Sequence, residues 1–221
     1  MPSRPYRSEL RAEQARTTRR ALVRAAHELF VERGYAGTTI DAVAERARVS
    51  RKTVFTAVGG KAELLKVAWD WALVGDDEPV PMAERPEVAA MLTETDPARL
   101  VHAWTRFLVP ITRRLAPLHP VMVSAARSDP EIAALNEISE QNLLGGATSF
   151  VSSLAKLGGL RASWTVERAA QVTTTLMDPM AFDRLVVRSG WTDEEFADWV
   201  EDVVLATFFA GPDTDVVLSS G

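Results

Sequence analysis

The sequence of residues 38–61 is TTIDAVAERARVSRKTVFTAVGGK, and its pattern predicts two short helices joined by a tight turn. Thr38 or Thr39 can cap the first helix, because a hydroxyl at that position accepts a bond from a free backbone N–H. The apolar residues of that helix recur at a spacing of three and four and predict one buried face: Ile40, Val43, Ala44 and Ala47. The turn spans residues 47–49, and Ser50 can cap the second helix. The pattern therefore predicts a helix-turn-helix.

The second helix of this pair is basic and rich in hydroxyl groups. Val54 and Val58 point back toward the first helix. The outward residues carry hydrogen-bond donors: Arg51, Lys52, Thr53 and Thr56. In a helix-turn-helix, the N-terminal end of the second helix lies in the major groove of DNA, where Arg and Lys reach base edges and phosphates. The alternative is an ordinary helical hairpin with a solvated basic face, and spacing alone does not separate the two.

The residues on either side complete a longer pattern. Residues 21–35 read ALVRAAHELFVERGY, and residues 61–65 read KAELL. With them, the first third of the chain resembles the DNA-binding domain of the TetR family of transcriptional regulators. In that family the first helix ends in Phe, a Gly-Tyr pair and Thr-Thr follow, and the recognition helix continues through an aromatic residue to Lys-x-x-Leu. The matching residues here are Phe30, Gly34, Tyr35, Thr38, Thr39, Phe55, Lys61, Glu63 and Leu64.

Three residues depart from the family pattern. Arg48 occupies the turn position where the family favours Gly, and a positive φ there adds strain of ~1 kcal/mol. Phe55 stands where the family commonly has Tyr, so it is expected to pack or stack rather than to donate a hydrogen bond. Val58 replaces a usual aromatic residue. None of these changes removes the predicted fold.

Charge is segregated along the chain. Residues 1–66 contain 14 Lys and Arg against 7 Asp and Glu, which gives +7; residues 67–221 contain 11 against 23, which gives −12. A basic N-terminal part suits the phosphate backbone of DNA, and an acidic remainder keeps that contact local. Chance asymmetry is the alternative, and the coincidence of the basic part with the helix-turn-helix argues against it.

The composition predicts a globular protein of a reducing compartment. Of its 221 residues, 47% are apolar and 25% are charged, which is enough to bury a core. The chain has no cysteine, shows no apolar segment of a signal peptide, and has no apolar run near the ~18 residues of a membrane span. We therefore expect a cytoplasmic protein that does not enter a membrane.

Three parts are expected along the chain: a flexible basic arm over residues 1–17, a TetR-type helix-turn-helix domain over 18–66, and an effector-binding and dimerisation domain over 67–221. The arm could insert Arg side chains into the minor groove, or it could be a solvated tail. The first helix is expected to begin at Thr17 or Thr18 and to end at Arg33, with Gly34 as its C-cap.

Proline, threonine and glycine mark the remaining helices. A fourth helix is expected over residues 61–74. Later helices are expected to open at Pro86, Pro97, Pro130, Thr165 and Thr192. Gly145 and Gly146 are expected to interrupt the helix that ends near Leu157, through a kink, a close approach or tight packing. A kink is expected at residues 178–179, and the last helix spans 193–211.

No segment has the alternation of a strand, so the predicted fold class is all-α: an N-terminal three-helix helix-turn-helix domain and a larger C-terminal helical domain. The last helix is apolar almost all round from Trp199 to Ala210. The last two long helices therefore predict a homodimer interface, as the resemblance also implies. The alternative is a buried core helix of a monomer.

Residue patterns of an enzyme are missing from the sequence. The three histidines, His27, His102 and His119, have no zinc-site spacing, and no nucleophile elbow or nucleotide-binding loop occurs. We expect no catalysis, no metal and no cofactor. Apolar residues of the C-terminal part could instead line a cavity for a small apolar or amphipathic effector: Trp69, Trp104, Phe107, Met122, Phe150, Met177 and Met180. The alternative for each is plain core packing.

The sequence thus predicts a DNA-binding regulator, in particular a repressor that a small molecule releases from a pseudo-palindromic operator. The candidate DNA-binding residues are Thr38, Thr39, Arg48, Ser50, Arg51, Lys52, Thr53, Phe55, Thr56 and Lys61. A regulator of the same fold that activates transcription, answers to a protein partner or needs no ligand is the first alternative. A helical enzyme or scaffold is the second.

Overall fold

The computed structural model of the chain describes residues 4–76 and 80–209. Its regular structure is helical, and among these residues the only extended pairing is an isolated bridge between Leu160 and Phe209. The all-α prediction is confirmed. The chain divides into two compact units, of which the first contains residues 1–77 and 117–137 and the second residues 78–116 and 138–221.

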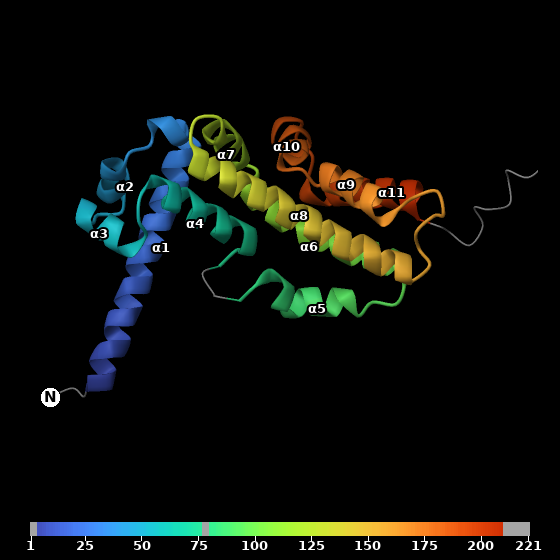
Figure 1. The fold of residues 1–221 in the computed structure, drawn as a ribbon, viewed down its shortest axis with the longest axis horizontal. Coiled ribbons are helices and arrows are strands. Elements are labelled where there is room, and N and C mark those ends of the chain that lie inside the picture. Colours follow the sequence, from blue (N-terminus) through green and yellow to red (C-terminus); the bar gives the residue numbers. More distant parts are fainter. Residues whose placement is uncertain (1–3, 77–79, 210–221) are drawn as a thin grey trace, which may run out of the picture. The chain divides into compact units, whose positions relative to one another are not determined.

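The first unit is built around one long helix (Figure 1). Its helices are α1 (Arg4–Gly37), α2 (Ile40–Arg46), α3 (Arg51–Ala57), α4 (Lys61–Val74), α7 (His119–Ala126) and the beginning of α8 (Pro130–Lys156). α1 packs against α2, α3, α4 and α7. Arg46 on α2 also binds both carboxylate oxygens of Glu32 on α1, at 2.6 and 2.8 Å, and this contact lowers the pKa of Glu32.

α1 begins earlier than its sequence pattern predicted. The helix starts at Arg4, so the prediction that it begins at Thr17 or Thr18 is wrong. Between Pro5 and Gly34 the chain has no Gly or Pro, and good helix formers such as Glu, Leu, Arg, Ala and Gln fill residues 9–16. Residues 10–17 are exposed, so intrinsic propensity and not core packing extends the helix. Gly34 ends its regular part, with a φ of 68°.

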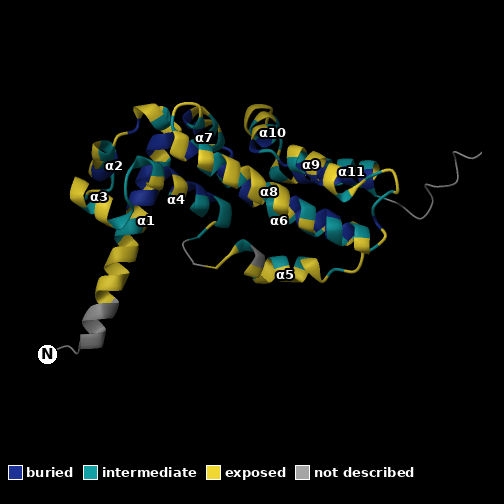
Figure 2. Cartoon of the chain, viewed as in Figure 1, coloured by how far each residue is buried: buried dark blue, intermediate teal, exposed yellow. Residues whose placement is uncertain are grey.

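The core of the first unit comes from the apolar faces that the sequence indicated. The fully or nearly fully buried side chains include Leu22, Leu29, Phe30, Val43, Val54, Leu64, Leu65, Trp69 and Met122. Because α4 and α7 supply part of this core, the compact unit extends beyond residues 18–66 and takes in residues from the predicted C-terminal domain. Figure 2 shows the burial along each helix.

The second unit contains α5 (Pro86–Leu92), α6 (Pro97–Leu115), most of α8, α9 (Val166–Leu176), α10 (Pro179–Phe182), a π-helical turn (Asp183–Arg188) and α11 (Asp193–Phe208). The break between α9 and α10 falls at the predicted kink. The helix α11 begins with the predicted capping box of Thr192 and Glu195. It ends at Phe208, and Ala210 and Gly211 of its predicted end lie outside the described residues.

Aromatic stacking and ion pairs organise this second unit. Trp104 on α6 stacks on Phe150 of α8 with ring centroids 4.3 Å apart. Three side chains of α6 contact acidic side chains of α11: Arg106 and Arg113 form ion pairs with Asp198 and Asp193, and His102 forms a hydrogen bond with Glu201. The helices α6 and α11 are therefore joined by charge as well as by apolar packing.

Gly145 and Gly146 do not interrupt α8. The helix is continuous from Pro130 to Lys156, so the predicted interruption is wrong. A methyl group added at either glycine would meet no atom within 4 Å, so the described residues provide neither a close approach nor tight packing there. Two interior glycines destabilise a helix by only ~1 kcal/mol each, which the long apolar face of α8 offsets.

Candidate nucleic-acid interface

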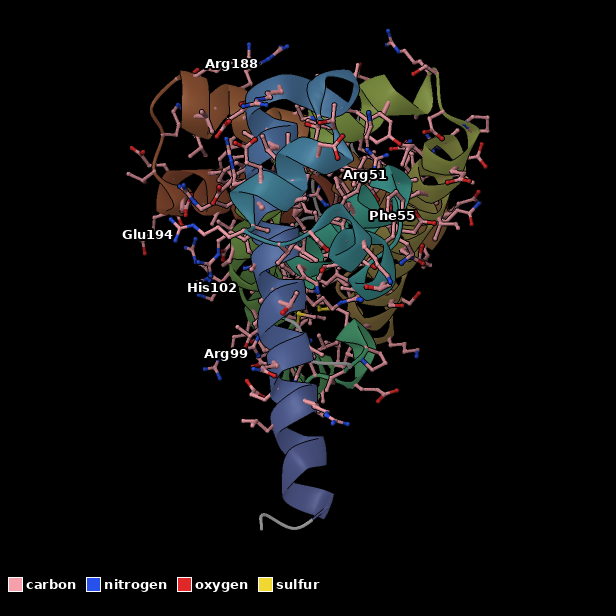
Figure 3. The ribbon with its side chains drawn as sticks, turned by 90° about the vertical axis from the view of Figure 1, so that its left-hand side faces the viewer. Arg51, Phe55, Arg99, His102, Arg188 and Glu194 are labelled. Carbon is pink, nitrogen blue, oxygen red and sulfur yellow. The ribbon has the colours of Figure 1, made fainter. Side chains whose placement is uncertain are left out.

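The short helix α3 is held by its cap and by one apolar anchor. The Oγ of Ser50 accepts a hydrogen bond from the backbone N–H of Thr53 at 3.1 Å, as the sequence predicted for an N-cap. Val54 is fully buried, and it is the only buried residue of α3. Arg51, Lys52, Phe55 and Thr56 are consequently left on the exposed side. Figure 3 labels Arg51 and Phe55 on this helix.

Two arginines hold α3 from its ends. Arg19 on α1 donates from Nη1 to the backbone carbonyl of Ala57, the last residue of α3, at 3.0 Å. A cation suits that position because the carbonyls at a helix C-terminus carry partial negative charge. At the other end, Arg51 forms an ion pair with Asp41 of α2. The sequence did not predict the roles of Arg19 and Asp41. Arg19 is 38 residues from Ala57 and Asp41 is 10 residues from Arg51, and neither separation corresponds to neighbours on one helix.

The turn before α3 has the conformation that the family pattern implied. Arg48 has a φ of 55°, the only positive φ among the described residues other than glycine. An L-residue in that region is strained by ~1 kcal/mol, because its Cβ crowds the following carbonyl. The Arg48 side chain is exposed. The position where Gly is common thus carries an exposed positive charge next to α3.

Thr38 does not belong to the exposed surface. Its side chain is 1% exposed, and its Oγ1 donates to the carbonyl oxygens of Leu29 at 3.0 Å and Gly34 at 2.8 Å. It joins the end of α1 to the start of α2, so its hydroxyl group is used within the protein and does not lie on the surface proposed to face DNA. The N-cap of α2 is Thr39, which is exposed and accepts a bond from the Ala42 N–H at 3.1 Å.

Lys61 lies in a cluster of side chains from three segments. Its Nζ is 4.2 Å from the centroid of the Tyr35 ring, and the Tyr35 hydroxyl donates to Asp129 at 2.7 Å. Burial lowers the pKa of Lys61, while the nearby Asp129 carboxylate raises it. Burial and the bond to Asp129 raise the pKa of Tyr35. The cluster ties the first turn of α4 and the end of α1 to Asp129, which caps α8 through the N–H groups of Glu131 and Ile132.

The predicted DNA-binding residues thus separate by exposure. Thr38 is buried, Thr53 and Lys61 are half-buried, and the exposed ones are Thr39, Arg48, Ser50, Arg51, Lys52, Phe55 and Thr56. The exposed group comes from α3, the preceding turn and the first cap of α2. It combines three positive charges with three hydroxyl groups and one aromatic ring. These are the groups that bind phosphates and base edges in nucleic-acid complexes.

The predicted effector residues do not gather in one unit. Trp69 and Met122 are buried in the first unit, and the other five belong to the second. There Trp104, Phe150 and Met177 are part of the packed core, and Phe107 is half-buried. Met180 is 58% exposed, so the prediction that it faces inward is wrong. It follows Pro179 in the first turn of α10, where Pro179 and Phe182 are the residues that turn inward.

Two further findings concern other classes of site. In residues 4–76 and 80–209, no group of three or more His, Asp or Glu is arranged to hold a metal ion. The described helices also include none that is long and apolar enough to cross a membrane.

Comparisons with known proteins identify relatives of this fold. A family model described as bacterial regulatory proteins, tetR family, matches residues 12–68. NalD, the secondary repressor of the MexAB-OprM multidrug efflux pump in Pseudomonas aeruginosa, has a TM-score of 0.64 at 18% identity, over 88% of this chain and 98% of that chain. The fatty acid degradation regulator FadR from Bacillus halodurans has a TM-score of 0.65 at 14% identity, over 85% and 94%. The SmeT-triclosan complex has a TM-score of 0.63 at 18% identity, over 88% and 93%.

At these identities the solved structures share the fold with this chain. No curated protein matches the sequence. The prediction that the chain is not an enzyme agrees with a family whose members are described as regulatory proteins.

Proposed function

Through residues 12–68 this chain belongs to the tetR family of bacterial regulatory proteins, and on that premise we propose that it is a transcriptional repressor. It binds a pseudo-palindromic operator as a homodimer and is released by a small apolar or amphipathic molecule. The observation that carries the proposal is the exposed basic and hydroxyl-rich surface around α3, on a helix that one buried valine, one cap and two arginines hold in place.

Each exposed residue has a proposed role at the DNA. Arg51, Lys52 and the half-buried Thr53 lie in the first turn of α3, the end that enters the major groove in a helix-turn-helix, and they contact base edges. The hydroxyl groups of Thr39, Ser50 and Thr56 and the ammonium of Lys61 contact phosphates. Arg48 serves either target. Phe55 packs or stacks, because it has no polar group to donate.

The dimer follows from the operator geometry. Two copies of α3 must lie about 34 Å apart, or a multiple of that distance, to enter major grooves on one face of the duplex. We assign the contact between copies to residues 166–188 and to α11. Exposed apolar side chains in the first of these segments support this assignment: Val172, Met180 and Val187 are 36%, 58% and 64% exposed. Apolar groups on a surface of this kind gain free energy when a second copy covers them.

The effector is proposed by analogy with proteins of the same fold. One is a repressor of a multidrug efflux pump, and another is a complex with triclosan. The core of the second unit contains Trp104, Phe150 and Met177, and Phe107 of the same unit is half-buried; these apolar and aromatic side chains support an apolar ligand. Such a ligand shifts the protein between DNA-binding and released conformers only as far as its affinities for the two differ.

DNA binding is tested directly with duplexes selected from a random library by the purified full-length protein. Fluorescence anisotropy is then measured for a selected duplex and a random duplex at two salt concentrations. We expect specific binding that weakens steeply with salt, because bound Lys and Arg release counterions from phosphates. Binding that is equal for both duplexes, or absent, would contradict the proposal.

A matched pair of double variants locates the surface. Arg51→Ala with Lys52→Ala should abolish specific binding while the thermal midpoint stays close to that of the wild type, because both side chains are exposed. Arg99→Ala with Lys156→Ala removes the same two charges from exposed positions of the second unit, outside the proposed contact between copies, and should leave DNA binding unchanged. Normal operator binding by the first double variant would mean that α3 is not the reading helix.

A further inference from the structure

We propose that Asp41 is a positioning residue that fixes Arg51 for base readout and thereby sets the sequence preference of α3. The inference rests on the proposed DNA-binding function and goes beyond it, because it gives an acidic residue a part in specificity. Its evidence is the ion pair between the first turn of α2 and the first turn of α3.

Asp41 engages a single nitrogen of Arg51 with its whole carboxylate. Arg51 Nη1 lies 3.0 Å from Oδ1 and 2.8 Å from Oδ2 of Asp41. The carboxylate itself is favourably placed, because it occupies the first turn of α2, where the free N–H groups of a helix attract negative charge. The Cζ atom of the Arg51 guanidinium also lies 5.7 Å from the centroid of the Phe55 ring. An acid and an aromatic ring therefore restrict a side chain that otherwise has many rotamers.

The pairing leaves the reading edge of Arg51 available. A guanidinium has five N–H donors, and within the described part of the chain only Nη1 of Arg51 forms hydrogen bonds. Nε and Nη2 can then donate together to two acceptors on one base. Guanine presents that pair in the major groove, as O6 and N7. The geometry therefore favours a guanine at the base pair that Arg51 contacts.

The ion pair between Asp41 and Arg51 orients side chains but adds little to the free energy of folding. Its side chain is 66% exposed and that of Arg51 is 60% exposed, and exposed ion pairs contribute little to stability. A carboxylate beside a DNA-binding helix also repels phosphates, so it weakens binding to any sequence. Its benefit is discrimination: Arg51 held by Asp41 is less free to adopt other rotamers that would contact a wrong base or a phosphate.

The test measures preference at one base pair. The full-length protein selects duplexes from a random library, and the pair read by Arg51 is the one at which Arg51→Ala loses its preference. Anisotropy titrations then give the affinity ratio between the selected duplex and a duplex changed at that pair. Asp41→Ala and Asp41→Asn should each lower the ratio about 2- to 5-fold, the range of an exposed ion pair.

Glu45→Ala is the matched control. Glu45 is an exposed acid one turn further along α2, with no side-chain partner among the described residues, so its removal changes the charge without touching Arg51. Both Asp41→Ala and Glu45→Ala should strengthen binding to random DNA, but only the first should change the ratio. Asp41→Ala combined with Arg51→Ala should match Arg51→Ala alone, because the two residues act as one unit.

The results that would contradict the role of Asp41 differ from the result that would contradict the proposed function. An unchanged ratio in Asp41→Ala, or the same ratio as in Glu45→Ala, would overturn the role of Asp41. A loss in Asp41→Ala that adds to that of Arg51→Ala would also overturn it, because Asp41 would then read a base itself, such as the cytosine amino group. If the wild type selects no sequence at all, the proposed function fails instead.

Discussion

The helices α3 and α11 are held in their units by different kinds of interaction. α3 has seven residues and one buried side chain, Val54, and its other ties are the Ser50 cap and the contacts of Arg19 and Arg51. α11 has 16 residues and buries Phe196, Ala197, Val200, Val204 and Phe208. A helix that must offer its surface to a partner cannot also bury that surface in its own core.

This difference predicts where mutations act. Changes in α11 should affect stability first, because burial of its apolar face is the main source of its free energy. Changes on the exposed face of α3 should affect binding first. Four substitutions follow, in order of decreasing effect on stability. The first two compare α11 with α3 directly, and the last two change other positions of the first unit.

Phe196→Ala should have the largest effect. Phe196 is fully buried and meets Phe182 edge to face, with ring centroids 5.1 Å apart. Its truncation removes this contact and leaves a cavity, so the free energy of unfolding should fall by about 3–5 kcal/mol. Urea unfolding followed by circular dichroism measures the loss. Ile138→Ala, which truncates a 54% exposed apolar residue of the same unit outside the proposed contact between copies, is the control. Equal midpoints for the two variants would show that α11 is not the anchor described here.

Val54→Ala should have the next largest effect. It removes the only apolar anchor of α3, and we expect a loss of about 2 kcal/mol together with weaker operator binding. Amide hydrogen exchange resolved by peptide should show faster exchange in residues 50–58. Phe55→Ala on the exposed side of the same helix should leave exchange nearly unchanged, since Phe55 is 48% exposed. If Val54→Ala destabilised the protein as much as Phe196→Ala, the proposed difference between the anchoring of α3 and that of α11 would be contradicted.

Tyr35→Phe should lower stability by about 1 kcal/mol at neutral pH, because it deletes the hydrogen bond to Asp129. That bond is the main cause that lowers the pKa of Asp129. A carboxyl group whose pKa is lower in the folded state stabilises it above the unfolded pKa, and this contribution disappears as the pH falls through the folded value.

The difference between wild type and Tyr35→Phe should therefore be present at pH 7 and should shrink below about pH 4. Urea midpoints at a series of pH values measure it. Ser128→Ala, which changes the residue beside Asp129 and removes only a long 3.3 Å bond to Ala125, is the control. A difference that grows toward acid pH would contradict this assignment.

Arg48→Gly should have the smallest effect on stability and the opposite sign. Glycine relieves the strain of the positive φ, ~1 kcal/mol, and its greater freedom in the unfolded chain offsets much of that gain. We expect a thermal midpoint about 1–2 °C higher. Arg48→Ala removes the same charge but keeps the strain, so it separates the two effects. If Arg48 contacts DNA, both variants should bind the operator more weakly, and equal thermal midpoints for the two would show that the turn is not strained.

Local sequence was enough to predict most of the helical structure. Ser50, Thr165 and the Thr192–Glu195 pair are caps where their spacing predicted them, and α4 has the predicted bounds. Arg48 has the backbone conformation that a Gly position implies. The start of α1 and the continuity of α8 were not predicted. In both cases the helical propensity of a long segment outweighs the effect of single capping or glycine residues.

The sequence by itself determined the helix-turn-helix, the exposed basic residues of α3 and the all-α class, because caps, periodicity and charge act between residues close together in the chain. Only the tertiary structure decided that Thr38 is buried, that Met180 is exposed, that Arg19 closes α3 and that Asp41 holds Arg51. These facts depend on which helices meet and at what angle. That is set by the packing of whole apolar faces, which no local spacing encodes.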